Sequence, residues 1–145
     1  MKTRLIVVLA AVLGILGAAF ALEPTTIQGD LYRTPSAEAL PGTFYRGTSV
    51  RMTNFQAWAD AEGVAIQDLT GIDVIVRIGG DVQSQAVTGT VYNATGGLFT
   101  ATFTIATNAT TEQGIEVELI DTNTVPNVSF IYPRIPFITT GRLGE

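Results

Sequence analysis

The chain has 145 residues, a formal net charge of −5 and no histidine or cysteine, and its single lysine is Lys2. It therefore lacks an imidazole base, a thiolate nucleophile, a His/Cys zinc site and, after residue 2, an amine for Schiff-base chemistry. The acidic balance repels phosphate backbones and argues against nucleic-acid binding. These exclusions favour a non-enzymatic structural or binding module that uses no cofactor and no metal.

The N-terminus has the pattern of a secretion signal. A basic start (Lys2 and Arg4) precedes 18 apolar or glycine residues, and Ala19 and Ala21 stand three and one residues before a cleavage point. The pattern predicts a signal peptide over residues 1–21. The alternative is an uncleaved membrane anchor, because a run of this length is at the lower limit for spanning a bilayer. The small residues at the cleavage point favour removal, and either outcome places the remainder outside the cytoplasm.

Residues 22–43 are expected to form an extended arm or linker. The stretch has little periodicity and carries three prolines among Thr, Ser, Gly and Ala. One short strand is expected near Ile27–Tyr32. The arm either docks on a neighbouring subunit or is a disordered leader, since chain termini are usually poorly ordered unless they are tied down.

Residues 44–138 have the pattern of short strands separated by turns. Alternating apolar and polar residues predict half-buried strands over residues 50–55, 72–78, 98–105, 115–119 and 128–132. In the first of these, Asn54 is expected to share a face with Val50 and Met52, and Phe55 to lie on the other face. A weaker, polar strand over residues 82–88 is expected at a sheet edge.

This arrangement of elements predicts an all-β fold. About six or seven short strands with turns every 8 to 12 residues indicate an antiparallel β-sandwich over residues 44–138. The helix-like stretch over residues 55–61 ends at an Asp-x-x-Gly turn, so a strand or loop is favoured there. No βαβ alternation is visible, which disfavours an α/β fold. Residues 139–145 are expected to be a loose tail.

Four segments carry a resemblance to a known family. They are the strand after Tyr45-Arg46-Gly47, the turn Asp60–Gly63, the turn Asp68–Gly71 that leads into Ile72–Arg77, and the strand Gly97–Phe103. On these residues, the stretch from Phe44 to Phe137 resembles the immunoglobulin-like domains of phage tail and baseplate proteins, especially the N-terminal type of baseplate upper proteins. The resemblance implies an immunoglobulin-like sandwich with a scaffolding or adaptor role and no catalytic residues.

Carboxylates are the acid–base groups that remain in quantity. Asp60, Glu62 and Asp68 cluster near one predicted turn and offer the hard oxygens that calcium prefers. Their spacing does not match an EF-hand, so a solvated turn is favoured. Glu116 and Glu118 share one face of a single strand, whereas a glycosidase needs two carboxylates facing each other across a cleft.

Aromatic side chains could form a sugar-stacking platform. Trp58, Tyr45, Tyr92 and Tyr132 are the candidates, although aromatic residues of a small sandwich are more often core. Tyr132 lies in an alternating apolar strand and is predicted to be core. Trp58, beside a turn, is the best exposed candidate for a binding residue.

Together these patterns predict a structural or adaptor module, displayed outside the cytoplasm or on a virion, that acts through contacts with protein subunits as a homo- or hetero-oligomer. The alternative is a secreted monomeric module that binds a surface glycan or a host surface through Trp58. A hydrolase that uses only carboxylates is the least favoured class. Contact with a membrane is expected only through residues 1–21, if they are retained.

Overall fold

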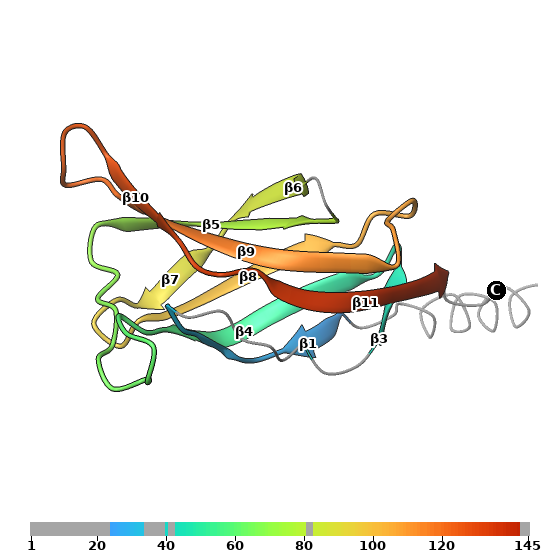
Figure 1. Cartoon of the computed structure of the whole chain (residues 1–145), viewed down its shortest axis with the longest axis horizontal. Helices are drawn as coiled ribbons and strands as arrows, with labels where there is room; N and C mark the ends of the chain where they lie inside the picture. Colours follow the sequence, from blue (N-terminus) through green and yellow to red (C-terminus); the bar gives the residue numbers. More distant parts are fainter. Residues whose placement is uncertain (1–23, 34–39, 41–42, 81–82, 143–145) are drawn as a thin grey trace, which may run out of the picture.

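The computed structural model describes residues 24–33, 40, 43–80 and 83–142. The predicted signal peptide, with Ala19 and Ala21, lies outside this part of the chain. The described residues form eleven strands and no helix, so none of them makes a helix that could span a membrane. The strands make two sheets with one apolar core between them (Figure 1). The predicted all-β sandwich is therefore confirmed.

Each sheet draws its strands from several parts of the chain. The first sheet contains β1 (Thr25–Ile27), β2 (Asp30–Leu31), β4 (Ser49–Ala57), β7 (Thr90–Asn93) and β8 (Leu98–Thr104). The second contains β3 (Thr43–Arg46), β5 (Ile72–Gly79), β6 (Gln83–Thr88), β9 (Glu112–Asp121), β10 (Val128–Ile131) and β11 (Ile135–Arg142). The strand orders are β1-β4-β8-β7, with β2 also on β4, and β3-β11-β9-β5-β6, with β10 also on β9. The polar strand predicted at an edge is β6, which ends its sheet.

The sheets are mixed, whereas the sequence pattern predicted antiparallel pairing. β1 and β2 run parallel to β4, and β3 runs parallel to β11. The remaining pairs are antiparallel. All three parallel pairs involve strands that precede residue 47. These strands have only two to four residues each, and side-chain alternation does not specify whether a strand runs parallel or antiparallel to its neighbour.

The stretch expected as an extended arm contributes to both sheets. Ile27 and Leu31, on strands that pair with β4, are buried, with 8% and 2% of their surface exposed. Leu40 is also buried, and its N–H donates to the Pro136 carbonyl on β11 at 2.9 Å. The chain therefore crosses from the first sheet to the second before β3 begins. The sandwich starts earlier than the boundary at residue 44 that the sequence suggested.

The C-terminal stretch expected as a loose tail also belongs to the second sheet as far as Arg142. Thr139 is 1% exposed, and its hydroxyl donates to the Thr110 carbonyl at 2.6 Å. Pro136 is the second residue of β11, a strand that the sequence pattern did not predict. It is tolerated inside β11, where its carbonyl accepts the bond from Leu40.

The central strands follow the predicted alternation. On β8, Phe99, Ala101 and Phe103 are buried while Thr102 and Thr104 are exposed. Ile115, Val117 and Leu119 of β9 are buried in the same way. Alternation in the sequence predicts burial correctly in these strands because one face of each sheet covers the core and the other meets water.

A β-bulge changes the facing of residues in β4. Asn54 has a φ of 51°, and the register with β8 shifts between Met52 and Phe55. The extra residue rotates Phe55 into the core, where it is fully buried, and leaves Asn54 exposed. The predicted facing of these two residues was wrong for this reason.

The last predicted strand also differs from the expectation. Tyr132 is buried as predicted, but Val128 is 60% exposed and Ile131 is 50% exposed. β10 pairs with the distal half of β9, and this hairpin projects beyond the sandwich at the upper left of Figure 1. Alternation alone could not show that the strand lies outside the core until its final residue, Tyr132.

Gly97 provides a test of backbone geometry at the start of β8. Its φ is +64°, and an added Cβ would lie 2.8 Å from the carbonyl oxygens of Ala57 and Gln67. Because both obstacles are backbone atoms, we expect Gly97→Ala to lower the free energy of unfolding by about 2–3 kcal/mol, measured by urea denaturation. Thr95→Ala in the same turn is the control, with an expected change below about 0.5 kcal/mol. Equal stability of the two variants would contradict this account of Gly97.

Candidate functional site

Trp58, the predicted binding residue, lies just after β4 and is half-buried. The main-chain N–H of Trp58 donates to the Leu31 carbonyl at 2.9 Å, and its indole Nε1 donates to Asp30 Oδ1 at 2.9 Å. The indole is parallel to the Tyr32 ring, with the two centroids 6.3 Å apart and 3° between the planes. β2 and Tyr32, which follows it, therefore hold the indole in place.

A glycine turn covers this aromatic pair. The turn predicted at Asp60–Gly63 is present, and Gly63 has a φ of +70°. A Cβ on Gly63 would lie 2.8 Å from the Tyr32 ring and 3.7 Å from the indole. Only a glycine backbone can approach the two rings this closely, so the loop packs directly on them.

A second set of contacts joins Trp58 to the projecting hairpin. Tyr132 donates its hydroxyl to the Trp58 carbonyl at 2.7 Å and meets the Phe130 ring edge-on at 5.1 Å. The Arg33 guanidinium lies 4.1 Å from the centroid of the Phe130 ring, within cation–π range. Arg33 also donates to Gln67 Oε1 at 2.9 Å.

We call Tyr32, Arg33, Trp58, Phe130 and Tyr132 the aromatic clasp. It joins the residues after β2, the loop after β4 and the base of the β9–β10 hairpin. Burial raises the pKa of Tyr132 to about 12, although the nearby charge of Arg33 acts in the opposite direction. The hydroxyl therefore stays protonated, as its bond to the Trp58 carbonyl requires.

Sequence reasoning identified Trp58 and Tyr132 but missed Tyr32, Arg33 and Phe130 as members of one cluster. The missing information is tertiary, because the segments that hold Arg33 and Phe130 are far apart in the chain. The other two aromatic candidates do not join the cluster. Tyr45 is 43% exposed on β3, and Tyr92 is 51% exposed on β7.

The carboxylate of Asp60 organises its own loop. Its two oxygens accept the N–H groups of Gly63, Val64 and Ala65 at 2.7, 3.1 and 2.7 Å. Partial desolvation acts to raise the pKa of Asp60, but the backbone donors outweigh it and hold the pKa below its ordinary value of 3.8. The carboxylate of Asp60 is therefore an anionic cap of this loop.

Asp68 has a similar local role. It accepts the Thr70 N–H at 2.8 Å and the Thr70 hydroxyl at 2.7 Å, and these bonds lower its pKa from 3.8. Across the described ranges, no three His, Cys, Asp or Glu side chains are grouped so that they could hold a metal ion.

We expect added calcium, or a chelator, to leave the melting temperature unchanged. A calcium-dependent rise measured by calorimetry would contradict this reading.

The lowered pKa of Asp60 predicts a pH dependence of stability. Because its pKa is lower in the folded state, the ionised group stabilises the fold above the unfolded pKa of about 3.9. This contribution is lost as the pH falls through the folded pKa. Urea midpoints measured from pH 7 to pH 2 should favour wild type over Asp60→Asn at neutral pH, and the difference should shrink below about pH 4. A constant difference across the range would exclude this role.

The two glutamates of β9 lie side by side, as predicted. Glu116 and Glu118 are partly buried and alternate with fully buried residues, and Glu118 forms an ion pair with Arg77 of β5. Arg77 lies directly opposite Glu116 in the strand register. Because both glutamates project from one strand, they do not face each other across a cleft.

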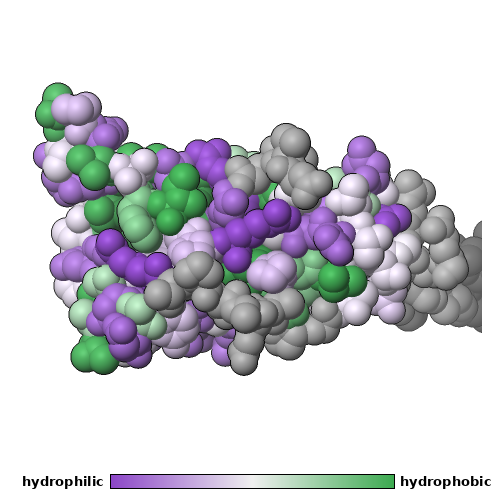
Figure 2. All heavy atoms as spheres, viewed as in Figure 1, coloured by the Kyte–Doolittle hydropathy of each residue, from purple (hydrophilic) through white to green (hydrophobic). Residues whose placement is uncertain are grey.

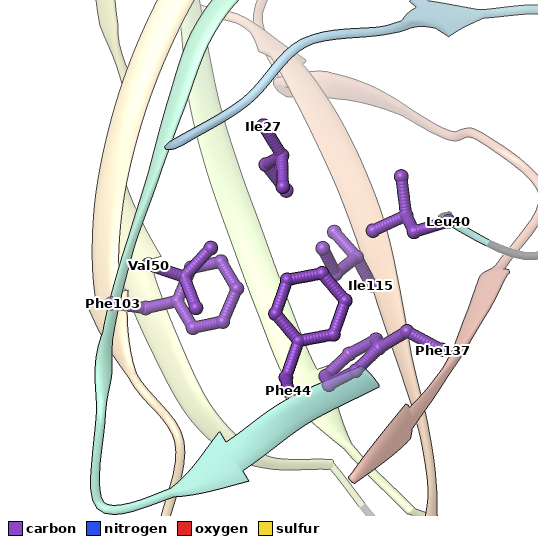
Figure 3. Close-up of a pocket in the computed structure, with 7 residues that line it drawn as sticks. All are labelled: Ile27, Leu40, Phe44, Val50, Phe103, Ile115 and Phe137. Carbon is purple, nitrogen blue, oxygen red and sulfur yellow. The ribbon is translucent and has the colours of Figure 1, made fainter. Parts of the chain in front are cut away.

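One apolar pocket is lined by residues of both sheets and by Leu40. Figure 3 shows its lining residues pointing toward one another: Ile27, Leu40, Phe44, Val50, Phe103, Ile115 and Phe137. It has no space large enough for a water molecule. Phe44 and Phe137 meet edge-on there, with their centroids 5.3 Å apart. The pocket is part of the packed core that holds the two sheets together.

No family model and no curated protein matches the chain. Its structure is similar to a solved phage domain, the N-terminal domain of phage TP901-1 ORF48, with a TM-score of 0.52 and 9% sequence identity. The match covers 78% of this chain and 98% of that one. At this identity the likeness concerns the fold alone. It confirms the coarser part of the sequence resemblance, because the chain has a fold that a phage protein uses.

Proposed function

We propose that the chain is a non-enzymatic structural or adaptor module, displayed on a phage virion or otherwise outside the cytoplasm, that acts through contacts with neighbouring protein subunits. The observation that carries the proposal is the fold shared with a domain of a phage protein. The sequence resemblance to phage tail and baseplate domains points to the same class. Scaffolding is the role that this resemblance implies.

The chemistry of the candidate site supports a structural role. The indole of Trp58 is bonded to Asp30 and stacked on Tyr32, and the Tyr132 hydroxyl is bonded to the Trp58 carbonyl. The carboxylate of Asp60 is bonded to its own loop. These polar groups hold segments of the chain together, which is the task of a module that presents a fixed surface.

The experiment that tests the proposal is size-exclusion chromatography with light scattering, on protein expressed from the full sequence. We expect the molar mass to exceed that of one chain and to rise with protein concentration. A clean monomer at high concentration would overturn the proposal.

Intact mass spectrometry of the same sample reports the start of the chain, which we expect at Leu22 after removal of residues 1–21.

A secreted module that binds a surface glycan is the second candidate function. The observation that favours it is the stacked pair of Trp58 and Tyr32, because Trp58 stays partly accessible at the surface. Aromatic rings of this kind offer an apolar face that a sugar ring can cover. Binding on a glycan array that is lost in Trp58→Ala, but kept in Tyr92→Ala, would support this function. Absence of binding by the wild-type protein would remove it.

A further inference from the structure

The outer edge of β10 has main-chain groups that point away from the fold. Inside the hairpin, the Tyr132 N–H donates to the Val117 carbonyl at 2.9 Å and the Val128 N–H donates to Thr124 Oγ1 at 3.1 Å. Alternate residues of a strand direct their N–H and C=O groups to the same side. The corresponding groups of Ser129 and Ile131 therefore point outward.

This edge is uncovered by the described part of the chain. β10 pairs with β9 alone, and the described residues supply no hydrogen-bond partner to the main chain of Ser129 or Ile131. An open edge of this kind is a template for pairing with another strand, and proteins usually block it with charge, proline or a covering segment. The strand Val128–Ile131 contains neither charge nor proline.

Apolar side chains accompany the open edge. Of the eight large hydrophobic residues that are exposed in the described ranges, three lie between residues 125 and 131: Val125 at 98%, Val128 at 60% and Ile131 at 50%. Figure 2 shows hydrophobic residues at the tip of the same hairpin. Apolar groups gathered on a projecting element mark an interaction site more clearly than singly scattered ones.

We propose that this edge is a self-association surface, at which the β10 strands of two copies pair antiparallel and join their β9–β10 hairpins into one sheet. The proposal rests on the proposed function and specifies the contact through which the subunits meet. Antiparallel pairing suits a second copy because the outward donors and acceptors of Ser129 and Ile131 complement those of an identical strand around a two-fold axis.

The distribution of charge makes this hairpin the place where two copies can meet. The chain carries a net charge of −5, so two copies repel each other over most of their surfaces. Residues 122–131 form an uncharged run of ten residues in this acidic chain. The run projects beyond the sandwich (Figure 1), so two hairpins can pair while the acidic bodies stay apart.

The aromatic clasp prepares the edge for pairing. Arg33 lies over Phe130 and Tyr132 is bonded to the Trp58 carbonyl, so the base of the hairpin is fixed to the body of the sandwich. A strand that is already ordered loses less conformational entropy when it pairs.

Two measurements on the full chain test the proposal. In sedimentation velocity, Ile131→Lys places a charge on the edge, and we expect self-association to weaken by about tenfold or more. Val64→Lys adds the same charge to a residue that is 81% exposed in another loop, and it should associate as wild type does. Circular dichroism should show both variants folded.

The second measurement uses the absence of natural cysteine from the chain. Ser129→Cys should be joined into a covalent dimer by a short thiol-to-thiol cross-linker, while Val64→Cys should stay monomeric on denaturing gels. Wild-type association that survives Ile131→Lys, with no cross-linking at position 129, would overturn the β10 surface while leaving a role in assembly intact. A wild-type chain that is monomeric throughout would overturn both.

Discussion

Replacing Tyr132 with alanine should lower the free energy of unfolding by about 3–5 kcal/mol, the largest loss we expect from any single change near the candidate site. Tyr132 is 1% exposed, so the substitution opens a cavity the size of an aromatic ring. It also removes the hydroxyl that donates to the Trp58 carbonyl at 2.7 Å. Urea denaturation monitored by circular dichroism measures the loss. Tyr92→Ala is the control, because that ring is 51% exposed, and it should cost less than about 1 kcal/mol.

The conservative variant separates the ring of Tyr132 from its hydroxyl. Tyr132→Phe keeps the packing but leaves the Trp58 carbonyl without this donor, at a cost of about 1–3 kcal/mol. Burial raises the pKa of Tyr132 from 10.0 to about 12. Between these two pH values the unfolded chain ionises and the folded chain does not, so the contribution of the neutral phenol to the free energy of unfolding is complete below pH 10 and is lost as the pH rises to 12. Wild type should therefore lose more stability than Tyr132→Phe over that interval. An equal decline in both proteins would show that Tyr132 is not the group that titrates.

Phe99→Ala should also cost about 3–5 kcal/mol. Phe99 is fully buried near the start of β8, and the centroid of its ring lies 6.0 Å from that of Phe55 on the neighbouring strand. Both rings belong to the first sheet, so the cavity would open in the layer that faces the second sheet. Differential scanning calorimetry should show a lower melting temperature.

The matched control for Phe99 lies three residues further along the same strand. Thr102 is exposed on the opposite face, so Thr102→Ala should change the free energy of unfolding by less than about 0.5 kcal/mol. A large loss in both variants would contradict the two-faced description of β8.

Prediction from sequence succeeded where a strand lies half-buried over its whole length. β8 and β9 each have one face on the core, so alternation along the sequence matches alternation in burial. The turn at Asp60–Gly63 was predictable for a similarly local reason, because an aspartate can cap the N–H groups of the residues that follow it.

Prediction failed where a local irregularity or a long-range contact decides the structure. Nothing in the pattern of β4 indicates that Asn54 adopts a positive φ and turns Phe55 inward. The strands before residue 47 are too short to show a period, although burial of Ile27 and Leu31 holds them in place. For the candidate site, the sequence indicated Trp58 but not its partners, because Arg33 and Phe130 meet only after the two sheets have assembled.

In a chain without histidine and cysteine, tyrosine and aspartate are the titratable groups of the candidate site, and the structure shows how they are used. The tyrosine and aspartates of the candidate site are bonded to backbone groups of the same chain. Without disulfides, the fold depends on its apolar core and on contacts such as the aromatic clasp. Outward main-chain groups and exposed apolar side chains occur together on β10, where the proposed self-association surface lies.

The proposed role requires this chain to assemble with protein subunits. Sedimentation velocity of the wild-type protein over a wide range of concentrations is the decisive test of this requirement. We expect the sedimentation coefficient to rise with concentration as single chains associate. A single species with the mass of one chain at every concentration would contradict the claim.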